Sequence, residues 1–184
     1  MHAKKQFGLV QMFWGNGKGK TTAALGEGFR AAGRGFKVHL IQFMKGGIDG
    51  NKDFEEYGEL KALRQFPNFS HKRFGVKKWV IGKPEPEHLV QGSDALKYAA
   101  EIVSSGKYDL VIIDEILYAV QLGVVSEQDV LAVIEAKLAN TELVLTGSHR
   151  PFPKIFEKAD LVTEMKKHKH PFDSGIEARK GIEL

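Results

Sequence analysis

Residues 15–22 contain, in the right order, the residue types that bind a phosphate group. Three glycines allow consecutive backbone N–H groups to converge on phosphate oxygens. Lys20 supplies a positive charge, and the Thr21 hydroxyl can ligate Mg²⁺. The candidate phosphate-binding residues are Gly15, Asn16, Gly17, Lys18, Gly19, Lys20, Thr21 and Thr22. The pattern predicts a site for a polyphosphate with a bound magnesium ion.

This segment departs in one place from the phosphate-binding loop motif G-x-x-x-x-G-K-[ST]. The motif requires its first glycine where this chain has Trp14, so the glycine turn starts one residue later, at Gly15. The alternative interpretation is a glycine-rich turn followed by a threonine that caps a helix. A strand-like segment before the loop and a helix-like segment after it favour phosphate binding.

Two acidic residues could complete such a site. Asp114 and Glu115 follow four consecutive aliphatic residues, 110–113, which have the pattern of a central parallel strand. Open α/β folds bind ligands at the carboxyl ends of their strands, where an acidic side chain can hold Mg²⁺ directly or through water. The alternative is that the pair only caps the following helix. The glycine-rich loop favours the metal-binding interpretation.

The elements that must position these residues are strands that alternate with helices. Short apolar runs predict strands at residues 7–14, 36–43, 69–74, 110–113, 143–145 and 161–165. Helical spacing and capping residues predict helices at residues 21–32, 53–63, 89 to about 106, from 126 to about 138, and 151–158. The alternation predicts an α/β fold whose parallel sheet is covered by helices on both faces.

Some parts of the chain give a weaker signal. The periodicity is poor at residues 53–63 and 69–74, and residues 44–51 have the three glycines of a loop long enough to carry function. The last dozen residues are polar and show no strong structural pattern. For the helix that starts near residue 89, apolar spacing predicts one buried face, made of Leu89, Leu96, Ala100 and Val103.

Length and composition favour one globular domain, residues 1–184, in a reducing cytoplasm. The 184 residues are 42% hydrophobic and 27% charged, which excludes a disordered chain. The absence of Cys excludes disulfides, a thiolate nucleophile and Cys-bound metal. No apolar run approaches 18 residues and no cleavage site follows the start, so we expect neither export nor a membrane span. The net charge of +4 favours anionic ligands without distinguishing nucleic acid from polyphosphate.

Two histidines near the C-terminus could act as a metal pair. His168 and His170 lie two residues apart, within a basic cluster that starts at Lys166. No third ligand lies near them in the sequence, so exposed or phosphate-facing histidines are the favoured interpretation.

Several segments together resemble one family, the ATP:corrinoid adenosyltransferases, also called cob(I)yrinic acid a,c-diamide adenosyltransferases. The matching segments are GNGKGKTTAALG, RAAGRG, IQFMKG, LVLTG, the strand before Asp114 and Glu115, and the C-terminal ADLVTEMKKHKHPFDSGIEARKGIEL. The resemblance implies a three-layer, RecA-like P-loop fold with a mostly parallel sheet of about six strands, usually as a homodimer. It also implies transfer of the 5′-deoxyadenosyl group of ATP to the cobalt(I) of a corrinoid, with release of triphosphate, in cobalamin biosynthesis or salvage.

The resemblance also assigns roles to individual residues. Residues 15–22 would hold the triphosphate, in a reversed orientation relative to ordinary NTPases. Lys20, Thr21 and Glu115 would be catalytic, with Mg²⁺ held by Thr21 and Glu115 and with Asp114 as a further candidate ligand. Three further residues would line the nucleotide and corrinoid pockets: Arg30, Gln42 and Lys45. A solvated helix residue is the alternative interpretation of Arg30.

The chain departs from the family pattern in three places. Members often carry a Phe-x-Trp pair that displaces the lower cobalt ligand; Trp79 fits, but Lys77 stands in place of Phe. Core packing is the alternative role of Trp79. A TGR-x-AP segment is replaced by residues 146–151, where Arg150 is the candidate for the arginine's role. Only six residues precede the first predicted strand, so the N-terminal lid of some relatives is missing or comes from a partner.

The resemblance implies a partner, and the loop and the basic residues leave competing functions open. A flavodoxin-like electron donor is the expected transient partner. The alternative function is a phosphoryl-transferring P-loop NTPase or small-molecule kinase, which would release ADP. A third class is a nucleotide-binding regulatory module or nucleic-acid binder, which is disfavoured because the basic residues form no groove studded with aromatics.

Overall fold

A sheet of six parallel strands forms the centre of the computed structural model, which describes residues 7–47 and 57–183. The strands are β1 (Val10–Trp14), β2 (Val38–Gln42), β3 (Phe69–Arg73), β4 (Leu110–Asp114), β5 (Glu142–Thr146) and β6 (Leu161–Glu164). Their order across the sheet is β3-β2-β4-β5-β1-β6, and every pair is parallel.

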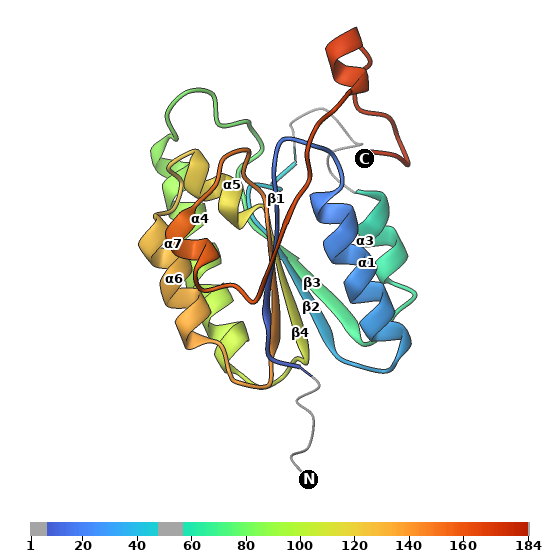
Figure 1. Ribbon diagram of the computed structural model, residues 1–184, viewed down its shortest axis with the longest axis vertical. Helices are drawn as coiled ribbons and strands as arrows, with labels where there is room; N and C mark the ends of the chain where they lie inside the picture. The colour runs from blue at the N-terminus through green and yellow to red at the C-terminus, as the bar shows by residue number, and fades with distance from the viewer. Residues whose placement is uncertain (1–6, 48–56, 184) are drawn as a thin grey trace.

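Helices cover both faces of the sheet. They are α1 (Lys20–Gly33), α3 (Gly58–Leu63), α4 (Pro86–Ser104), α5 (Ile116–Gln121), α6 (Glu127–Ala136) and α7 (Pro153–Phe156), with a 3₁₀ helix η1 (Pro171–Ser174) near the end. Figure 1 shows α1 and α3 on one side of the sheet and α4 to α7 on the other. The buried apolar residues form two clusters, which are the two hydrophobic cores. The expected three-layer α/β fold is therefore confirmed.

The strand sequences explain which strands are central. All five residues of β2, β4 and β5 are buried, as expected for strands that are apolar on both faces. In contrast, β6 is an edge strand and most of its residues are exposed. Because β1, β5 and β4 are parallel neighbours, the loop after β1 and the acidic pair after β4 lie at the same edge of the sheet, separated by one strand.

The predicted elements agree with the structure in kind and differ in detail. Each of the six expected strands is present, and the strand expected from residue 7 starts at Val10. The helix α5 was not expected, because its six residues follow the acidic pair directly without a separate start signal. Residues 53–56 of one expected helix and residues 48–51 of the expected loop lie outside the described residues.

The buried face predicted for α4 is wrong in part. Leu89 is 44% exposed, whereas the small residues Gly92, Ala95 and Ala99 are buried against the core. A Cβ on Gly92 would come within 2.7 Å of a Val124 methyl, so glycine allows α4 to pack closely against the segment at Val124. Hydrophobic spacing misses such a face because close packing of small residues, rather than apolar size, determines it.

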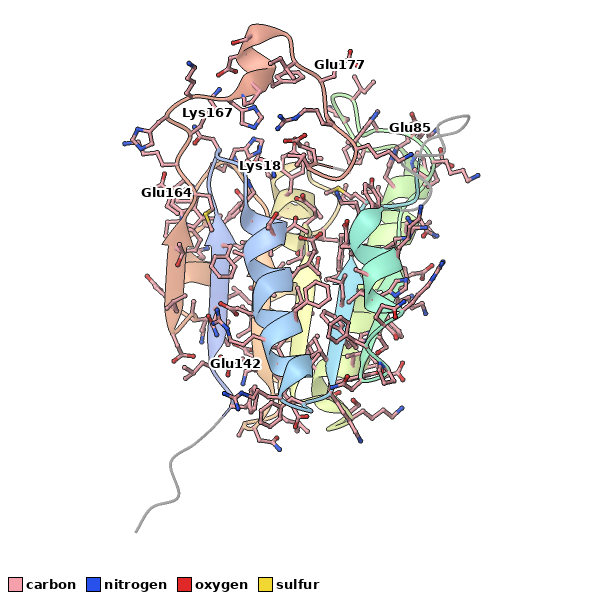
Figure 2. All side chains as sticks on the ribbon, turned by 90° about the vertical axis from the view of Figure 1, so that its right-hand side faces the viewer. Lys18, Glu85, Glu142, Glu164, Lys167 and Glu177 are labelled. Atoms are coloured by element: carbon pink, nitrogen blue, oxygen red, sulfur yellow. The ribbon has the colours of Figure 1, made fainter. Side chains whose placement is uncertain are left out.

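The end of the sheet opposite the acidic pair is held by a buried carboxylate. Glu142 accepts hydrogen bonds from the backbone N–H groups of Gly8 and Leu9, at 2.8 and 2.7 Å, and from the Gln11 side chain. Figure 2 shows Glu142 far from Lys18.

Within the part of the chain that the structure describes, no helix has both the length and the apolar character needed to cross a bilayer.

Candidate functional site

The loop between β1 and α1 is packed tightly against the end of β6. The N–H of Gly15 donates to the Ser148 carbonyl at 3.0 Å, and the N–H of Gly17 donates to the Met165 carbonyl at 2.6 Å. A Cβ at Gly15 or at Gly17 would lie 2.5 or 2.7 Å from that same Met165 oxygen. Gly15 also has a φ of 112°, a backbone conformation that favours glycine. The glycine turn is therefore required by the packing.

Lys20 curls back over this loop. Its Nζ donates to the carbonyl oxygens of Gly15 at 2.7 Å and Gly17 at 3.0 Å. Burial lowers the pKa of Lys20, while the nearby Glu115 and Asp114 carboxylates act in the opposite direction. The ammonium group thus lies where phosphate oxygens would meet the loop, at the N-terminus of α1.

Asp114 connects four elements at the carboxyl edge of the sheet. Its Oδ1 accepts from the hydroxyls of Thr21 at 2.9 Å and Thr146 at 2.6 Å, and its Oδ2 accepts from Gln42 Nε2 at 3.2 Å. The side chain is fully buried. Gln42 is itself fully buried and lines none of the cavities described below, so the expectation that it lines a pocket is wrong; instead it orients the carboxylate from β2. Its own Oε1 is buried without a hydrogen-bond partner among the described residues.

Glu115 has a left-handed backbone conformation, with a φ of 62°, immediately before α5. Its N–H donates to the Thr146 hydroxyl at 3.0 Å. Such a conformation costs about 1–3 kcal/mol in a non-glycine residue and persists where the surroundings fix it. Burial and the Asp114 carboxylate raise the pKa of Glu115, and the ammonium groups of Lys45 and Lys20 oppose that rise.

The oxygen atoms of Thr21, Asp114 and Glu115 fit a magnesium ion that is shared with a phosphate. Mg²⁺ is usually held by one or two carboxylates together with substrate phosphates, rather than by an all-protein cage. Within residues 7–47 and 57–183, no group of three or more His, Cys, Asp or Glu could hold a metal ion by itself. Two carboxylates and one hydroxyl, next to the glycine-rich loop, agree with a magnesium ion held jointly by the protein and a substrate phosphate.

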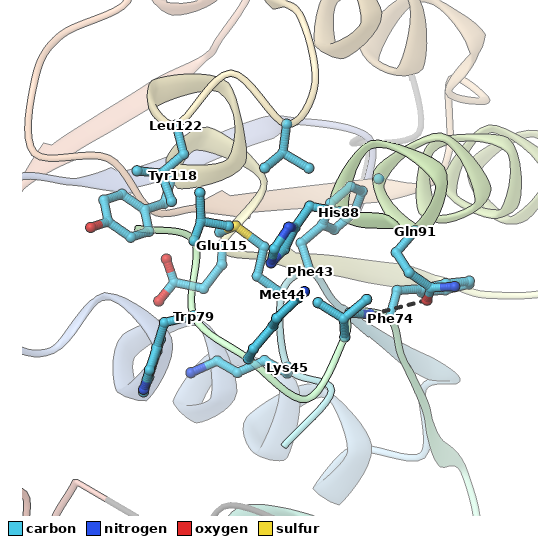
Figure 3. Close-up of a pocket in the computed structure, with 16 residues that line it drawn as sticks. Phe43, Met44, Lys45, Phe74, Trp79, His88, Gln91, Glu115, Tyr118 and Leu122 are labelled. Carbon is cyan, nitrogen blue, oxygen red and sulfur yellow. Dashed lines mark hydrogen bonds between the residues drawn. The ribbon is translucent and has the colours of Figure 1, made fainter. Parts of the chain in front are cut away.

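Two cavities meet at Lys45 and Glu115, which line both. The first, which we call the apolar cavity, measures about 160 Å³ and is lined by aromatic and aliphatic side chains between β4, α4 and the loops after β2 and β3 (Figure 3). The second, the polar cavity, measures about 370 Å³ and runs along residues 18–22 of the loop. The site therefore has a polar half along the loop and an apolar half, which share Lys45 and Glu115.

Lys45 stands between the two cavities. Its Nζ lies 5.0 Å from the centre of the Tyr57 ring, in a cation–π arrangement. Burial disfavours its charged form, but the surrounding acidic groups, with Glu115 and Asp114 first among them, raise the pKa of Lys45 overall. The structure thus brings Lys45 to the site, as the sequence predicts.

Trp79 belongs to the same site, in the loop between β3 and α4. It lines the apolar cavity together with Glu115 and Lys45 (Figure 3). Its side chain is 59% exposed, so the alternative of core packing is wrong.

Two further residues of the loop after β1 are placed as follows. Thr22 lines the polar cavity, and Asn16 accepts a hydrogen bond from the Lys167 N–H at 2.9 Å.

The structure does not bring two predicted residues to the site. Arg30 is exposed in the last turn of α1, about 15 Å along the helix axis from Lys20 at ~1.5 Å per residue. Arg150 lies over the Phe152 ring, 5.2 Å from its centre, and lines none of the cavities described. Its neighbour His149 instead lies beside Lys20, in a third cavity. Sequence spacing could not show which side chain after β5 turns toward the loop.

The C-terminal segment is linked to the family by its sequence, but the sequence did not predict which of its residues reach the loop after β1. The segment crosses the loop after β1, where Lys18 Nζ donates to the Ile182 carbonyl at 3.1 Å (Figures 1 and 2). Residues 181–183 line the polar cavity, and His170 lines the third cavity with Lys167 and Asp173. His170 thus lies beside Lys18 and Lys20 in the third cavity, whereas His168 is exposed and lines none of the three cavities.

Comparisons with known proteins agree with this geometry. A family model described as "ATP:corrinoid adenosyltransferase BtuR/CobO/CobP" matches residues 6–184. The chain is 35% identical to a corrinoid adenosyltransferase of Pseudomonas aeruginosa, over 99% of this chain and 86% of that protein. It is 30% identical to the corrinoid adenosyltransferase of Escherichia coli K12, over 98% of this chain and 88% of that protein. Since the family match spans the loop, the acidic pair and the C-terminal segment, the chain belongs to the ATP:corrinoid adenosyltransferase family and is an enzyme of that kind.

Proposed function

We propose that this enzyme transfers the 5′-deoxyadenosyl group of ATP to the cobalt(I) of a corrinoid and releases triphosphate, in cobalamin biosynthesis or salvage. The single observation that carries the proposal is the contact between the two cavities at Lys45 and Glu115. A phosphate-binding loop alone would suit any NTPase. An apolar cavity with an exposed tryptophan beside it suits a large, partly apolar second substrate.

The reaction needs little from the protein besides charge stabilisation and alignment. An electron pair on cobalt(I) forms the Co–C bond to C5′, the C5′–O bond breaks, and its electron pair stays on the triphosphate oxygen. Because the attacking pair comes from the corrinoid substrate, no side chain has to remove a proton. This agrees with a site in which, among the described residues, Lys20 Nζ donates to loop carbonyls and Asp114 accepts from hydroxyl and amide donors.

The residues of the loop have separate tasks in this proposal. The backbone N–H groups and Lys20 stabilise the negative charge that grows on the leaving triphosphate. Thr21, Asp114 and Glu115 would hold Mg²⁺, which when bound supplies further charge to the phosphate oxygens. Gln42 and Thr146 keep the Asp114 carboxylate in place through their hydrogen bonds. The apolar cavity aligns the corrinoid with C5′, which raises the rate by proximity.

The competing proposal is phosphoryl transfer by an ordinary P-loop NTPase or kinase. It uses the same loop, the same metal ligands and the same lysine. Plain NTP hydrolysis gives no role to the apolar cavity or to the exposed Trp79, whereas a kinase would use that cavity for its phosphoryl acceptor. The two reactions differ in their products, which are triphosphate in one case and ADP in the other.

An anaerobic assay separates the two proposals. The protein is incubated with ATP, Mg²⁺ and chemically reduced cobinamide, the absorbance change of Co–C bond formation is followed, and nucleotide products are separated by chromatography. We expect adenosylcobinamide and triphosphate in equal amounts. ADP that forms at the same rate with and without corrinoid, with no Co–C bond formed, would contradict adenosyl transfer.

We further propose two partners, which rest on the family resemblance. A flavodoxin-like protein would supply the electron that reduces the corrinoid cobalt, and the enzyme would act as a homodimer. Sedimentation analysis and a coupled reduction assay with a purified flavodoxin test these two proposals separately.

A further inference from the structure

His88 is a buried side chain of the apolar cavity to which no role has yet been given. It lies in the first turn of α4, is 6% exposed, and lines the cavity with Glu115, Trp79 and Tyr118 (Figure 3). Its Nδ1 contacts the backbone N–H of Glu85 at 3.1 Å. Its Nε2 is buried and has no hydrogen-bond partner among the described residues.

The contact with Glu85 fixes the tautomer of the His88 ring. A backbone N–H can only donate, so Nδ1 must accept and carries no proton. The ring proton is therefore on Nε2. The cavity thus contains an N–H donor that is shielded from water and finds no acceptor in residues 7–47 and 57–183, an arrangement that costs free energy unless a partner arrives.

The helix cap by itself does not explain the histidine. Glu or Gln at the third helical position performs the same capping contact, and either side chain is flexible enough to place its polar atoms elsewhere. Histidine instead holds one nitrogen on the Glu85 N–H and keeps the other in the cavity, because both belong to one rigid ring.

The size of the cavity limits what the donor can meet. About 160 Å³ is below the range of ~300–1,000 Å³ in which proteins enclose a whole small ligand. The cavity therefore fits an edge or a side chain of a larger molecule. Gln91, which also lines it, already uses its Oε1 to accept from the Gly75 N–H at 3.2 Å.

We propose that His88 is a specificity-determining residue whose Nε2–H donates a hydrogen bond to a carbonyl oxygen on the periphery of the corrinoid. The inference rests on the proposed function, because it takes the occupant of the apolar cavity to be the corrinoid edge. The carboxamide side chains around a corrin ring are acceptors of the required kind. His88 is not a cobalt ligand in this arrangement, because the nitrogen that faces the cavity bears the proton and has no free lone pair.

Two substitutions separate the ligand-binding role from the capping role. Asn places its oxygen near the position of histidine Nδ1, so His88→Asn keeps an acceptor for Glu85 and removes the donor from the cavity. Gln places its terminal amide near the position of Nε2, so His88→Gln keeps a donor in the cavity and weakens the cap. His71→Asn is the matched control, since His71 is exposed on β3 and lines none of the cavities described.

The experiment measures cobinamide binding by tryptophan fluorescence, the KM values for reduced cobinamide and for ATP, and the thermal midpoint of each variant. For His88→Asn we expect a Kd and a KM for cobinamide about tenfold higher than wild type, which equals roughly 1.4 kcal/mol. The KM for ATP and the thermal midpoint should stay unchanged. His88→Gln should bind cobinamide nearly as wild type does but unfold at a lower temperature, and His71→Asn should match wild type in every value.

The opposite pattern overturns the proposal. Wild-type cobinamide binding in His88→Asn would show that His88 only caps α4 or contacts a trapped water. Loss of cobinamide binding in His88→Gln but not in His88→Asn would also contradict the proposed hydrogen bond to the corrinoid. If the wild-type protein itself neither binds cobinamide nor adenosylates it, the proposed function fails and this inference fails with it. That outcome differs from a failure of the inference alone, in which wild type is fully active.

Discussion

Burial and charge act against each other at Lys20. Burial lowers the pKa of its ammonium group, and the carboxylates of Glu115 and Asp114 oppose that change. The hydrogen bonds to the Gly15 and Gly17 carbonyls hold the group inside the loop. A phosphate that enters the loop would replace those carbonyls as the acceptor, so the charge is in place before the reaction starts and needs little reorganisation.

Removal of this charge should slow the reaction strongly. In Lys20→Ala we expect a kcat about 10²- to 10³-fold below wild type, because the leaving triphosphate loses one charged donor. The thermal midpoint should change little, since the hydrogen bonds of Lys20 Nζ to described residues are to two carbonyls of the loop after β1. Stopped assays at saturating ATP and cobinamide give kcat, with Lys97→Ala, exposed on α4, as the control. A variant that keeps the wild-type kcat would contradict the assignment of the loop.

Trp79 should matter most when cobalt has to be reduced first. If its exposed ring displaces the lower ligand of the corrinoid, Trp79→Ala will lower the rate from cobalt(II) about tenfold more than the rate from chemically prepared cobalt(I), a difference of roughly 1.4 kcal/mol. Parallel assays from the two starting states measure this ratio. Ile81→Ala, in the same loop and 87% exposed, is the control. Equal losses from both states would leave Trp79 as a simple wall of the cavity.

At the scale of elements, β2 contains a buried histidine that the reaction does not use. His39 is 2% exposed, shares its two nitrogens with Ser70 Oγ at 2.7 Å and Tyr98 OH at 3.1 Å, and stacks on Tyr108. Burial, followed by the charges of His71 and Lys72, lowers the pKa of His39 to about 4. The neutral ring is therefore part of the core between β2, β3 and α4.

This histidine should make the fold less stable as the pH falls. The unfolded chain binds a proton at His39 near pH 6.5, whereas the folded chain does so only near pH 4, so stability is lost as the pH falls between these values. From pH 7 to pH 5 the loss is roughly 2 kcal/mol at ~1.36 kcal/mol per pKa unit. Urea unfolding of wild type and of His39→Phe at both pH values measures it. The prediction is wrong if both proteins lose equal stability.

At the scale of the whole molecule, local pattern predicted the frame of the site. The aliphatic run before Asp114 predicted a central strand, and the capping pair of Ser126 and Asp129 predicted the start of α6, where the Ser126 hydroxyl accepts from the Asp129 N–H at 3.1 Å. Parallel strands bring their carboxyl ends to one edge, so the loop near Lys20 and the acidic pair could be placed together without coordinates.

The rest of the site depends on contacts between residues far apart in the sequence. The contact of Lys18 with Ile182 joins residues 164 positions apart, and that of Lys167 with Asn16 spans 151. No periodicity records such pairs. Arg150 and His149 are adjacent, yet only His149 faces the loop, since the turn after β5 decides which side chain points inward. His88 was missed because a capping residue and a cavity donor look alike in a sequence.

The most direct test of the account follows the oxygen that bridges C5′ and the α-phosphorus of ATP. ATP labelled at that oxygen with a heavy isotope is incubated anaerobically with Mg²⁺, reduced cobinamide and the wild-type protein, and the phosphate products are analysed by mass spectrometry. Attack at carbon breaks the C5′–O bond, so we predict that triphosphate carries the full label and that the nucleoside product carries none. Labelled ADP with unlabelled phosphate, and no labelled triphosphate, would show attack at phosphorus and contradict the account.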